Sequence, residues 1–412
     1  KLPLSKPPKS SQRIAILGAG LAGSSLAYSL NRRGLSTTVF DTARTIAAGA
    51  SGIPQLALRP RLFQSDSALA EYYLQSYLFA VRQLTSFIKT AGLAWHNTGV
   101  LQFNNALNRK SEFELNKIKK LYPYHVVRYH KELKEYEFLV ANNKPIIEFP
   151  QGGWVCSHKL CELLLEDSKT EIKLGTHINK VHKADKLWIL STNTQEQFAF
   201  DIVIFANSEG ISELGQTDSL PLEITSGQVS TFYANNSNMR VDKVICGSRS
   251  LFPSFEEGVR SHLVAASYRN STSLEQLVED DEENYVSVNS LLETGFQLLK
   301  KPQKSQVALR TNTPDKIPLV GQIPNPHNVC KEYRELSFNA KKKFSNTIQA
   351  DNYFQGLYIS AAHGSNGLAT CGFSAEIISS LICNEQLPVS NEILDALNPI
   401  RFVIRNLKKQ EY

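Results

Sequence analysis

A glycine-rich turn behind a short apolar run is the segment of this chain best suited to hold a charged cofactor. Gly18, Gly20 and Gly23 have the spacing GxGxxG, between a predicted strand at residues 14–17 and a predicted helix that ends at Gly34. The first glycine permits the turn, the second leaves room for a pyrophosphate, and the third lets the helix pack closely on the strand. The helix N-terminus adds free N–H groups and the positive end of the helix dipole. The segment therefore predicts a dinucleotide site.

An acidic residue completes this pattern. Asp41 follows the next predicted strand, residues 36–40, and lies roughly 20 residues beyond the first glycine, where a ribose hydroxyl needs an acceptor. A glycine turn alone is weak evidence, because such turns also join ordinary strands and helices. Here the turn has its strand, helix, second strand and acid, so nucleotide binding is the favoured interpretation.

Two later segments have the same character. An apolar run at residues 198–206 ends in small polar residues at 207–210, which suits a buried parallel strand that ends next to a ligand. Farther on, a predicted strand at 357–360, a glycine-containing loop at 361–367 and an apolar helix at 368–382 follow one another. This second unit predicts that both ends of the chain contribute to the cofactor site, although an ordinary strand-to-helix turn would look the same in isolation.

The composition limits the class of protein. The 412 residues are 42% hydrophobic and 20% charged, which is ordinary for a globular enzyme of two domains. The six cysteines are scattered without a CxxC pair, so we expect a reducing compartment and no metal site. We find no apolar stretch near the length of a membrane span, and residues 1–11 look like a Pro/Lys linker rather than a signal peptide. We therefore predict a cytoplasmic protein.

A net charge of +6 makes the chain mildly basic. The cations gather at residues 341–343 and in the C-terminal residues Arg401, Arg405, Lys408 and Lys409. Such clusters are compatible with a polyanionic partner, but most are solvated faces of a helix or loop. Charge alone leaves contact with nucleic acid open.

These segments together resemble the D-amino-acid oxidase and glycine oxidase superfamily of FAD enzymes. That superfamily has an N-terminal GxGxxG, a Gly-Ala-Ser-Gly loop (here 49–52), a late Asp-x-Val-Ile-x-Ala strand (here 201–206) and a C-terminal glycine loop and helix. The resemblance implies an α/β fold, in which a Rossmann-like FAD-binding domain is joined to a second α+β substrate domain built on an antiparallel sheet. It also implies that the C-terminal helix points its N-terminus at the flavin, where its dipole stabilises negative charge.

A further series of segments is more specific. These are Pro150-Gln151-Gly152-Gly153-Trp154, Gly227-Gln228-Val229-Ser230 and Ala396-Leu397-Asn398-Pro399 with Arg401. Over residues 13–409 the series resembles the C-terminal FAD oxidase domain of the bifunctional MnmC family, which makes 5-methylaminomethyl-2-thiouridine in tRNA. The resemblance implies FAD as cofactor, tRNA as substrate, a fused or associated SAM-dependent methyltransferase as partner, and a monomer that does not act at a membrane.

The reaction that this resemblance implies is oxidation of 5-carboxymethylaminomethyluridine at the wobble position. The flavin takes a hydride from the glycine-like CH₂, the imine hydrolyses, glyoxylate leaves, and 5-aminomethyluridine remains for methylation. The protein contributes orientation and electrostatics, because the flavin carries the redox chemistry.

The resemblance also assigns site residues. Arg310 opens a segment of the form Arg-x-x-x-x-Asp-x-x-Pro-x-x-Gly, whose arginine holds the substrate carboxylate through two parallel hydrogen bonds; a structural ion pair is the alternative. His363 is a second catalytic candidate, or else a packed loop histidine. We expect FAD to be bound without a covalent link to Cys371. The residues implied in cofactor binding are Gly18, Gly20, Leu21, Ala22, Gly23, Asp41, Ala50, Ser51, Gly52, Gln55, Val181, Ala206, Asn207, Gly364, Ser365, Asn366, Gly367 and Leu368.

The chain departs from the tRNA oxidase pattern at three positions where that family has arginine. Here they are Pro54, Pro314 and Asn366. The expected fold and cofactor are unaffected, but the losses bear on substrate affinity, tRNA contact and activity. Two alternatives therefore stay open: an FAD oxidase of a free secondary amino acid such as glycine or sarcosine, and a weakly catalytic tRNA-binding module that supports a methyltransferase.

The order of the segments predicts a chain that passes repeatedly between two domains. Helical spacing predicts helices at residues 68–91, 113–121, 157–167 and 274–299. The expected FAD-binding parts are residues 13–90, 150–218 and 308–400, the substrate parts are 91–149 and 219–307, and a linker (1–12) and a basic tail (401–412) complete the chain.

Overall fold

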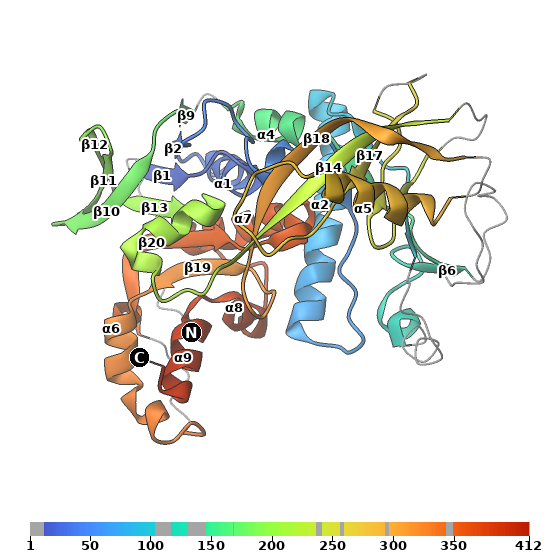
Figure 1. Ribbon diagram of the computed structural model, residues 1–412. Helices are drawn as coiled ribbons and strands as arrows, with labels where there is room; N and C mark the ends of the chain where they lie inside the picture. Colours follow the sequence, from blue (N-terminus) through green and yellow to red (C-terminus); the bar gives the residue numbers. More distant parts are fainter. Residues whose placement is uncertain are drawn as a thin grey trace. The chain divides into compact units, whose positions relative to one another are not determined.

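The structure is a computed structural model that forms two compact units (Figure 1). The first comprises the described parts of Lys1–Gly52, His158–Glu223 and Arg310–Tyr412, and the second those of Ile53–Ser157 and Ile224–Leu309. The structure describes residues 12–103, 117–130, 146–167, 169–235, 241–255, 259–292, 296–342 and 349–411.

A six-stranded sheet with the order β19-β20-β13-β1-β2-β9 is the centre of the first unit. Its pairs run parallel except that β19 lies antiparallel to β20. Every residue of β1 and β13 is buried, as expected for strands of a parallel sheet covered on both faces. The Rossmann-like sheet that the sequence predicts is confirmed. Its strands are β1 (Ile14–Leu17), β2 (Thr37–Phe40), β9 (Thr170–Lys173), β13 (Ile202–Phe205), β19 (Leu319–Pro324) and β20 (Tyr353–Ala361).

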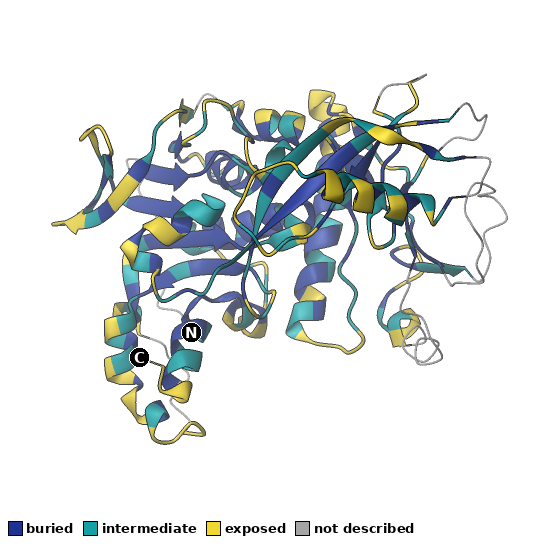
Figure 2. Ribbon diagram, in the orientation of Figure 1, coloured by how far each residue is buried: buried dark blue, intermediate teal, exposed yellow. Residues whose placement is uncertain are grey.

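Two helices that each follow a glycine-containing loop pack against each other beside this sheet. They are α1 (Leu21–Asn31) and α7 (Gly367–Cys383). The stretch Gly364–Cys383 has the length and hydropathy of a membrane span, contrary to our expectation that no stretch approaches one. Its burial explains its composition, because α7 packs on α1, β19 and β20 (Figure 2).

The remaining elements of the first unit are short helices and a small sheet. The helices are α4 (Ser157–Leu165), α6 (Pro326–Glu332), α8 (Asn391–Leu397) and α9 (Ile400–Lys409), and the antiparallel sheet consists of β10 (Ile178–Ala184), β11 (Leu187–Thr192) and β12 (Gln197–Phe200).

The second unit contains an eight-stranded sheet with the order β18-β14-β17-β16-β15-β5-β7-β6. Most of its described pairs are antiparallel, but β15 and β5 run parallel, so the predicted antiparallel sheet contains one parallel pair. The strands are β5 (Val100–Phe103), β6 (Arg128–His130), β7 (Ile146–Phe149), β14 (Glu223–Ala234), β15 (Val244–Cys246), β16 (Ser250–Leu251), β17 (Ser261–Ala265) and β18 (Leu298–Asn312). A smaller sheet of β3 (Leu56–Leu58), β8 (Gly153–Val155) and β4 (Trp95–His96), with helices α2 (Ala68–Ala91) and α5 (Val278–Asn289), completes the unit.

The boundaries of the two units differ from those expected from sequence. Helix α2 belongs to the second unit because it packs on β3 and β4, and residues 150–157 belong there because β8 pairs with the same two strands. The expected basic tail is helix α9, which packs on α6.

Three predicted elements also need correction. The run at 198–206 is two strands, because the chain turns at Asp201 between antiparallel β12 and parallel β13. The acidic helix α5 is confined to Val278–Asn289, and residues 298 onward form β18. Of the predicted helix at 113–121, residues 117–121 are helical and 113–116 lie outside the described residues, as do residues 1–11 of the expected linker.

The two most specific sequence segments have structural roles. Gly153 has a φ of 159°, and a Cβ there would lie 2.0 Å from the carbonyl oxygen of His96. The ring of Trp154 stacks on His96 with centroids 3.8 Å apart. In the C-terminal segment, Asn398 Nδ2 donates to the buried hydroxyl of Tyr353 at 2.7 Å. These residues therefore stabilise local structure within each unit.

An ion pair joins two segments that the sequence analysis singled out. Arg401 follows the Ala396–Pro399 segment, and Asp315 lies in the segment that Arg310 opens. Arg401 donates to Asp315 through Nε at 2.9 Å and Nη2 at 3.3 Å, and its Nη2 also donates to the carbonyl oxygen of Ile317. Burial alone would raise the pKa of Asp315, but the hydrogen bonds and charge of Arg401, with smaller contributions from Thr313 and the N–H of Ile317, hold that pKa below its ordinary value. The pair fixes the loop that follows β18.

Asp315→Asn should lower the stability of the protein by about 1–2 kcal/mol near neutral pH, since the pair is only partly exposed. The folded pKa lies below the unfolded one, so the contribution is complete above the ordinary value of 3.8 and is lost as the pH falls through the lowered folded pKa. Thermal unfolding followed from neutral to acid pH should show the two proteins converging only at the acid end. Glu223→Gln, which removes an exposed pair with Lys316, is the control; an equal effect there would contradict this role for Asp315.

Candidate FAD site

Four loops of the first unit lie at one edge of its sheet. Strands β1, β2, β13 and β20 run parallel, so their carboxyl ends reach the same side. The loops that follow them begin at Gly18, Asp41, Ala206 and Ala362. Open parallel sheets bind ligands outside the carboxyl ends of their strands. The structure thus brings together four segments that the sequence predicted separately.

The glycines of the first loop lie where side chains would collide. Gly18 has a φ of +106°, and a Cβ there would lie 2.5 Å from the carbonyl oxygen of Ala206. A Cβ at Gly23 would lie 1.8 Å from the carbonyl oxygen of Gly18. These contacts are with backbone atoms, which cannot move aside cheaply. Gly18 and Gly23 therefore have the packing roles expected of a dinucleotide fingerprint.

The N–H groups of this loop have defined partners. Asp41 accepts from the N–H of Ala19 at 2.7 Å and, through its other oxygen, from that of Ala43 at 2.8 Å. Ser51, in the short 3₁₀ turn Ala50–Gly52, accepts through Oγ from the N–H of Leu21 at 2.9 Å. The predicted residues Ser51 and Leu21 thus meet, and Asp41 holds the loop at Ala19 in addition to any contact with a ribose.

Asn207 carries an unused polar atom at this edge. Its Oδ1 is buried and has no hydrogen-bond partner within the residues that the structure describes. A Cβ on Gly18 would lie 2.9 Å from Asn207 Cα, so the backbone of Asn207 borders the glycine loop. An orphaned acceptor here fits a site that receives a polar ligand.

Two other predicted residues are engaged elsewhere. Val181 lies on β10 in the small antiparallel sheet, and its carbonyl oxygen accepts from Gln216 Nε2 at 2.7 Å. Gln55 lies in the second unit, where its buried amide donates to the carbonyl oxygen of Pro253 at 3.1 Å. A role in binding FAD stays a prediction for both.

The C-terminal glycine loop also leaves no room for a side chain at one of its glycines. Ala362 and Gly364 both have positive φ, +58° and +54°, and a Cβ on Gly364 would lie 2.3 Å from Oδ1 of Asn312, at the end of β18. The 3₁₀ turn Gly364–Asn366 then leads directly into α7. Ser365, Gly367 and Leu368 lie at this turn and first helical residues, as predicted.

His363 connects the strand, the loop and the helix. Its Nε2 lies 3.1 Å from Ser360 Oγ and its Nδ1 lies 2.9 Å from Thr370 Oγ1. Thr370 in turn donates to the carbonyl oxygen of Asn366 at 2.9 Å. Because the threonine proton is used there, we assign the imidazole proton to Nδ1, with Ser360 donating to Nε2.

Burial among these groups lowers the pKa of His363 to about 4. The imidazole is therefore neutral near pH 7, and both ring nitrogens are satisfied inside the loop. This arrangement favours a positioning role for His363 over the role of acid or base.

The position of Arg310 follows from strand geometry. Arg310 and Asn312 are two residues apart on β18, so their side chains leave the same face of the strand. Asn312 meets Gly364, while Thr311, on the opposite face, lies 3.3 Å from Ser208 through their hydroxyls. Arg310 is thereby directed to the side of the glycine loop.

These features fit FAD. A glycine loop at a helix N-terminus suits the pyrophosphate, and the start of α7 supplies a second positive dipole end. Cys371 lies one turn inside α7, where burial, with a smaller contribution from Cys161, raises the pKa of its thiol. A buried thiol of this kind does not ionise readily, which agrees with our prediction of a non-covalent cofactor.

Sequence analysis did not single out Asn312, Ser360 or Thr370. Asn312 lies two positions beyond Arg310, and residues two apart on a strand share a face, which was the signal available for Asn312. Thr370 lies one helical turn beyond Asn366. The partners themselves come from distant segments and needed the structure.

The chain belongs to the DAO family of FAD-dependent oxidoreductases. The model of that family, described as "FAD dependent oxidoreductase", matches residues 13–381. FAD is accordingly its cofactor.

Its similarity to particular proteins extends over nearly the whole chain. The tRNA 5-methylaminomethyl-2-thiouridine biosynthesis bifunctional protein MnmC of Shewanella amazonensis is 32% identical over 98% of this chain and 61% of the relative. The MnmC protein of Legionella pneumophila is 24% identical over 97% of this chain and 58% of the relative. The chain thus spans about three-fifths of the length of these curated relatives, and our sequence resemblance is confirmed.

Solved structures of the same fold include two that act on amino acids by name. Glycine oxidase from Geobacillus kaustophilus has a TM-score of 0.73 at 15% identity, covering 95% of this chain and 99% of that one. L-Proline dehydrogenase from P. horikoshii has a TM-score of 0.72 at 14% identity, covering 96% and 98%. At this identity the likeness confirms the predicted fold class.

Asp41→Ala should weaken FAD binding by about 1–3 kcal/mol, because the N–H of Ala19 loses its acceptor and the loop its anchor. The dissociation constant of FAD, measured by titrating apoprotein and following flavin fluorescence, checks this. Glu171→Ala, which removes an exposed carboxylate from neighbouring strand β9, is the control. An unchanged dissociation constant for Asp41→Ala would remove Asp41 from the site.

His363 should not titrate between about pH 5 and 8, since its pKa is lowered to about 4. Nitrogen NMR of the imidazole should show a neutral ring with its proton on Nδ1 throughout that range. Protonation of His363 near pH 6–7 would contradict the closed network.

Proposed function

We propose that this chain is the oxidase that converts 5-carboxymethylaminomethyluridine at the tRNA wobble position into 5-aminomethyluridine. The same chemistry would apply to the 2-thio form of the nucleoside. The substrate carries a secondary amine between the uracil and an acetate group, as in an N-substituted glycine. A C–H bond of the CH₂ next to the carboxylate breaks, the resulting imine takes up water, and glyoxylate leaves. We place this reaction in the cytoplasm.

The names of the relatives support this proposal. The MnmC proteins are bifunctional by name, and this chain aligns with about three-fifths of their length. A remaining part of that size would accommodate a methyltransferase that uses the 5-aminomethyl product. We therefore propose a SAM-dependent methyltransferase, fused or associated, as partner.

The placement of Arg310 is the single observation that most favours a carboxylate substrate. Arg310 is directed to the same side of β18 as Asn312, which touches the Gly364 loop. A guanidinium there can grip a carboxylate with two parallel bonds and so fix the adjacent CH₂.

The chain's own residues supply orientation and charge stabilisation. When bound, FAD supplies the two-electron acceptor. The N–H groups that open α7 stabilise negative charge nearby, and the neutral ring of His363 keeps those N–H groups in place. Because Pro54, Pro314 and Asn366 replace three family arginines, Arg310 carries the carboxylate contact with fewer cationic neighbours.

The test is to incubate the FAD-loaded protein with tRNA that carries 5-carboxymethylaminomethyluridine. Mass analysis of the digested nucleosides should show 5-aminomethyluridine, with an equal amount of glyoxylate in solution. Oxidation of free glycine or sarcosine, with the tRNA unchanged, would make the chain an amino-acid oxidase instead. Binding of tRNA without oxidation of either substrate would make it a weakly catalytic module.

Arg310→Ala should bind FAD normally but lose about 2–5 kcal/mol of transition-state stabilisation in kcat/KM. Arg310→Lys should recover only part of the loss, because a point charge cannot form two parallel bonds. Arg32→Ala removes an exposed arginine at the end of α1 and should be without effect. Near-normal turnover of Arg310→Ala would mean that the carboxylate is held elsewhere.

A further inference from the structure

Two basic segments that are far apart in the sequence meet in the first unit. One is the α6 region, residues 326–342, and the other is the end of α9 with the two residues that follow it, residues 405–411. Helix α9 packs on α6 and on the 3₁₀ turn Arg334–Ser337 through a small apolar cluster that includes Tyr333, Leu336 and Leu407. Gln410 Nε2 also donates to the carbonyl oxygen of Ser337 at 2.7 Å.

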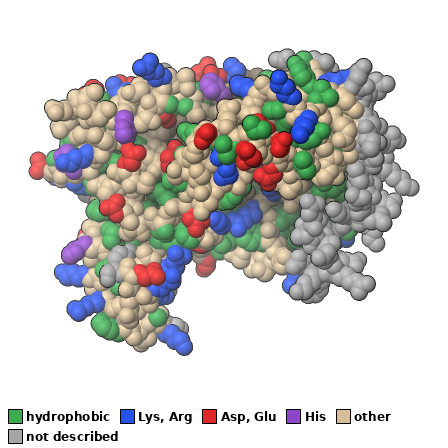
Figure 3. Space-filling model, viewed as in Figure 1, with side chains coloured by type: hydrophobic (Ala, Val, Ile, Leu, Met, Phe, Trp, Pro, Cys, Tyr) green, Lys and Arg blue, Asp and Glu red, His purple; other side chains and the backbone are tan. Residues whose placement is uncertain are grey.

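Because α6 and α9 pack together, Lys and Arg side chains from both segments lie on the same part of the first unit (Figure 3). We call the set Lys331, Arg334, Lys341, Lys342, Lys408 and Lys409 the α6–α9 basic surface; all six are exposed. The same two segments carry only three carboxylates, those of Glu332, Glu335 and Glu411.

The carboxylates neutralise only part of this charge. Glu335 pairs with Lys342, Glu411 pairs with Lys409 at 3.5 Å, and Glu332 accepts from Asn352. Within the described part of the chain, no ion pair involves the other four cations of the surface: Lys331, Arg334, Lys341 and Lys408. The surface therefore retains a net positive charge near pH 7.

An exposed aromatic side chain lies between two cations of this surface in the sequence, Arg334 and Lys341. Phe338 is 80% exposed, more than any other large hydrophobic residue that the structure describes. It follows Ser337, whose carbonyl oxygen accepts from Gln410, and lies three residues before Lys341. Aromatic rings among cations are a usual means by which proteins stack on bases next to bound phosphates.

We propose that the α6–α9 basic surface binds the tRNA, with its cations on phosphates and Phe338 against an unpaired base. The proposal rests on the proposed function, since it assigns a docking surface for that substrate. Phosphate contacts of this kind position the RNA without reading its sequence. An anionic membrane would meet the same charge, but it offers no unpaired ring for Phe338 to stack on.

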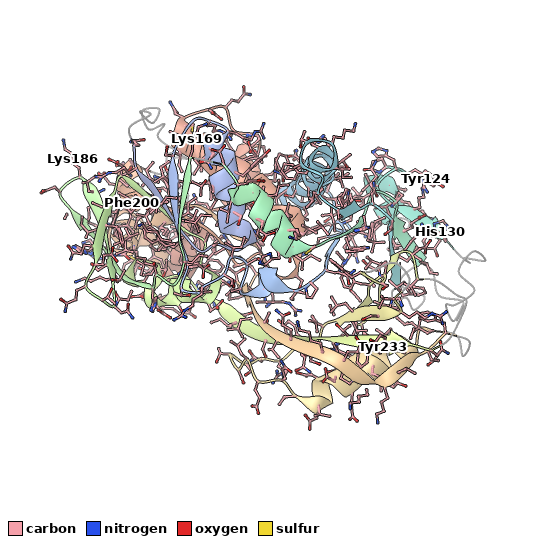
Figure 4. The ribbon with its side chains drawn as sticks, turned by 90° about the horizontal axis from the view of Figure 1, so that it is seen from above. Tyr124, His130, Lys169, Lys186, Phe200 and Tyr233 are labelled. Carbon is pink, nitrogen blue, oxygen red and sulfur yellow. The ribbon has the colours of Figure 1, made fainter. Side chains whose placement is uncertain are left out.

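The experiment compares two double variants of the FAD-loaded protein. Lys341→Gln/Lys408→Gln removes one cation from each segment of the surface. Lys180→Gln/Lys186→Gln removes two exposed lysines from β10 and from the β10–β11 turn, where Lys186 projects from the unit (Figure 4). The two pairs match in charge and exposure, and both lie outside the candidate FAD site. Binding of unmodified tRNA is measured by fluorescence anisotropy over a range of salt concentrations.

We expect Lys341→Gln/Lys408→Gln to weaken tRNA binding about tenfold and to reduce the slope of log affinity against log salt by about two. Lys180→Gln/Lys186→Gln should change neither. Phe338→Ala should weaken binding several-fold with the slope unchanged, because stacking releases no counterions. For turnover, KM for tRNA should rise in Lys341→Gln/Lys408→Gln while kcat stays the same.

Three results would overturn the proposal. Equal losses in the two double variants would show non-specific attraction, and normal binding by Lys341→Gln/Lys408→Gln would place the RNA elsewhere while leaving the proposed function intact. Loss of binding to vesicles containing phosphatidylserine, with tRNA binding unchanged, would identify a membrane surface. If the unaltered protein binds no tRNA, the proposed function itself fails.

Discussion

The close approach of Asn312 to Gly364 is the contact on which the candidate site depends. A Cβ on Gly364 would lie 2.3 Å from Asn312 Oδ1, and the backbone there has a positive φ. Only glycine meets both conditions cheaply. This contact ties the end of β18 to the loop that opens α7, and strand geometry then directs Arg310 toward the same loop. Arg310, the proposed carboxylate anchor, and the N-terminus of α7 thus lie on one side of the first unit.

The loops of this site are held by side chains of the protein before any ligand is considered. Asp41 and Ser51 hold the first glycine loop, and His363 holds the second. A preorganised site loses less conformational entropy on binding, so more of the contact energy is available for affinity and orientation. The same arrangement explains why the pKa of His363 is lowered to about 4: its environment suits a neutral structural ring.

Local signals in the sequence predicted the elements of the FAD-binding unit well. Strand β1, the glycine turn, α1, β20 and α7 follow from apolar runs bounded by glycine. The sequence could not predict partners set by tertiary packing, such as Asn312 with Gly364 or Thr370 with His363. It also misplaced α2, because helical spacing shows which face of a helix is buried but not which sheet covers it. The convergence of α6 and α9 likewise depends on long-range packing.

The most direct test of this account is a crystal structure of the FAD-loaded protein with an unreactive N-substituted glycine bound. The account predicts that the ligand carboxylate lies within hydrogen-bond distance of the Arg310 guanidinium and that the pyrimidine edge of the flavin faces the first turn of α7. A carboxylate held by other side chains, with Arg310 in contact only with protein groups, would contradict it.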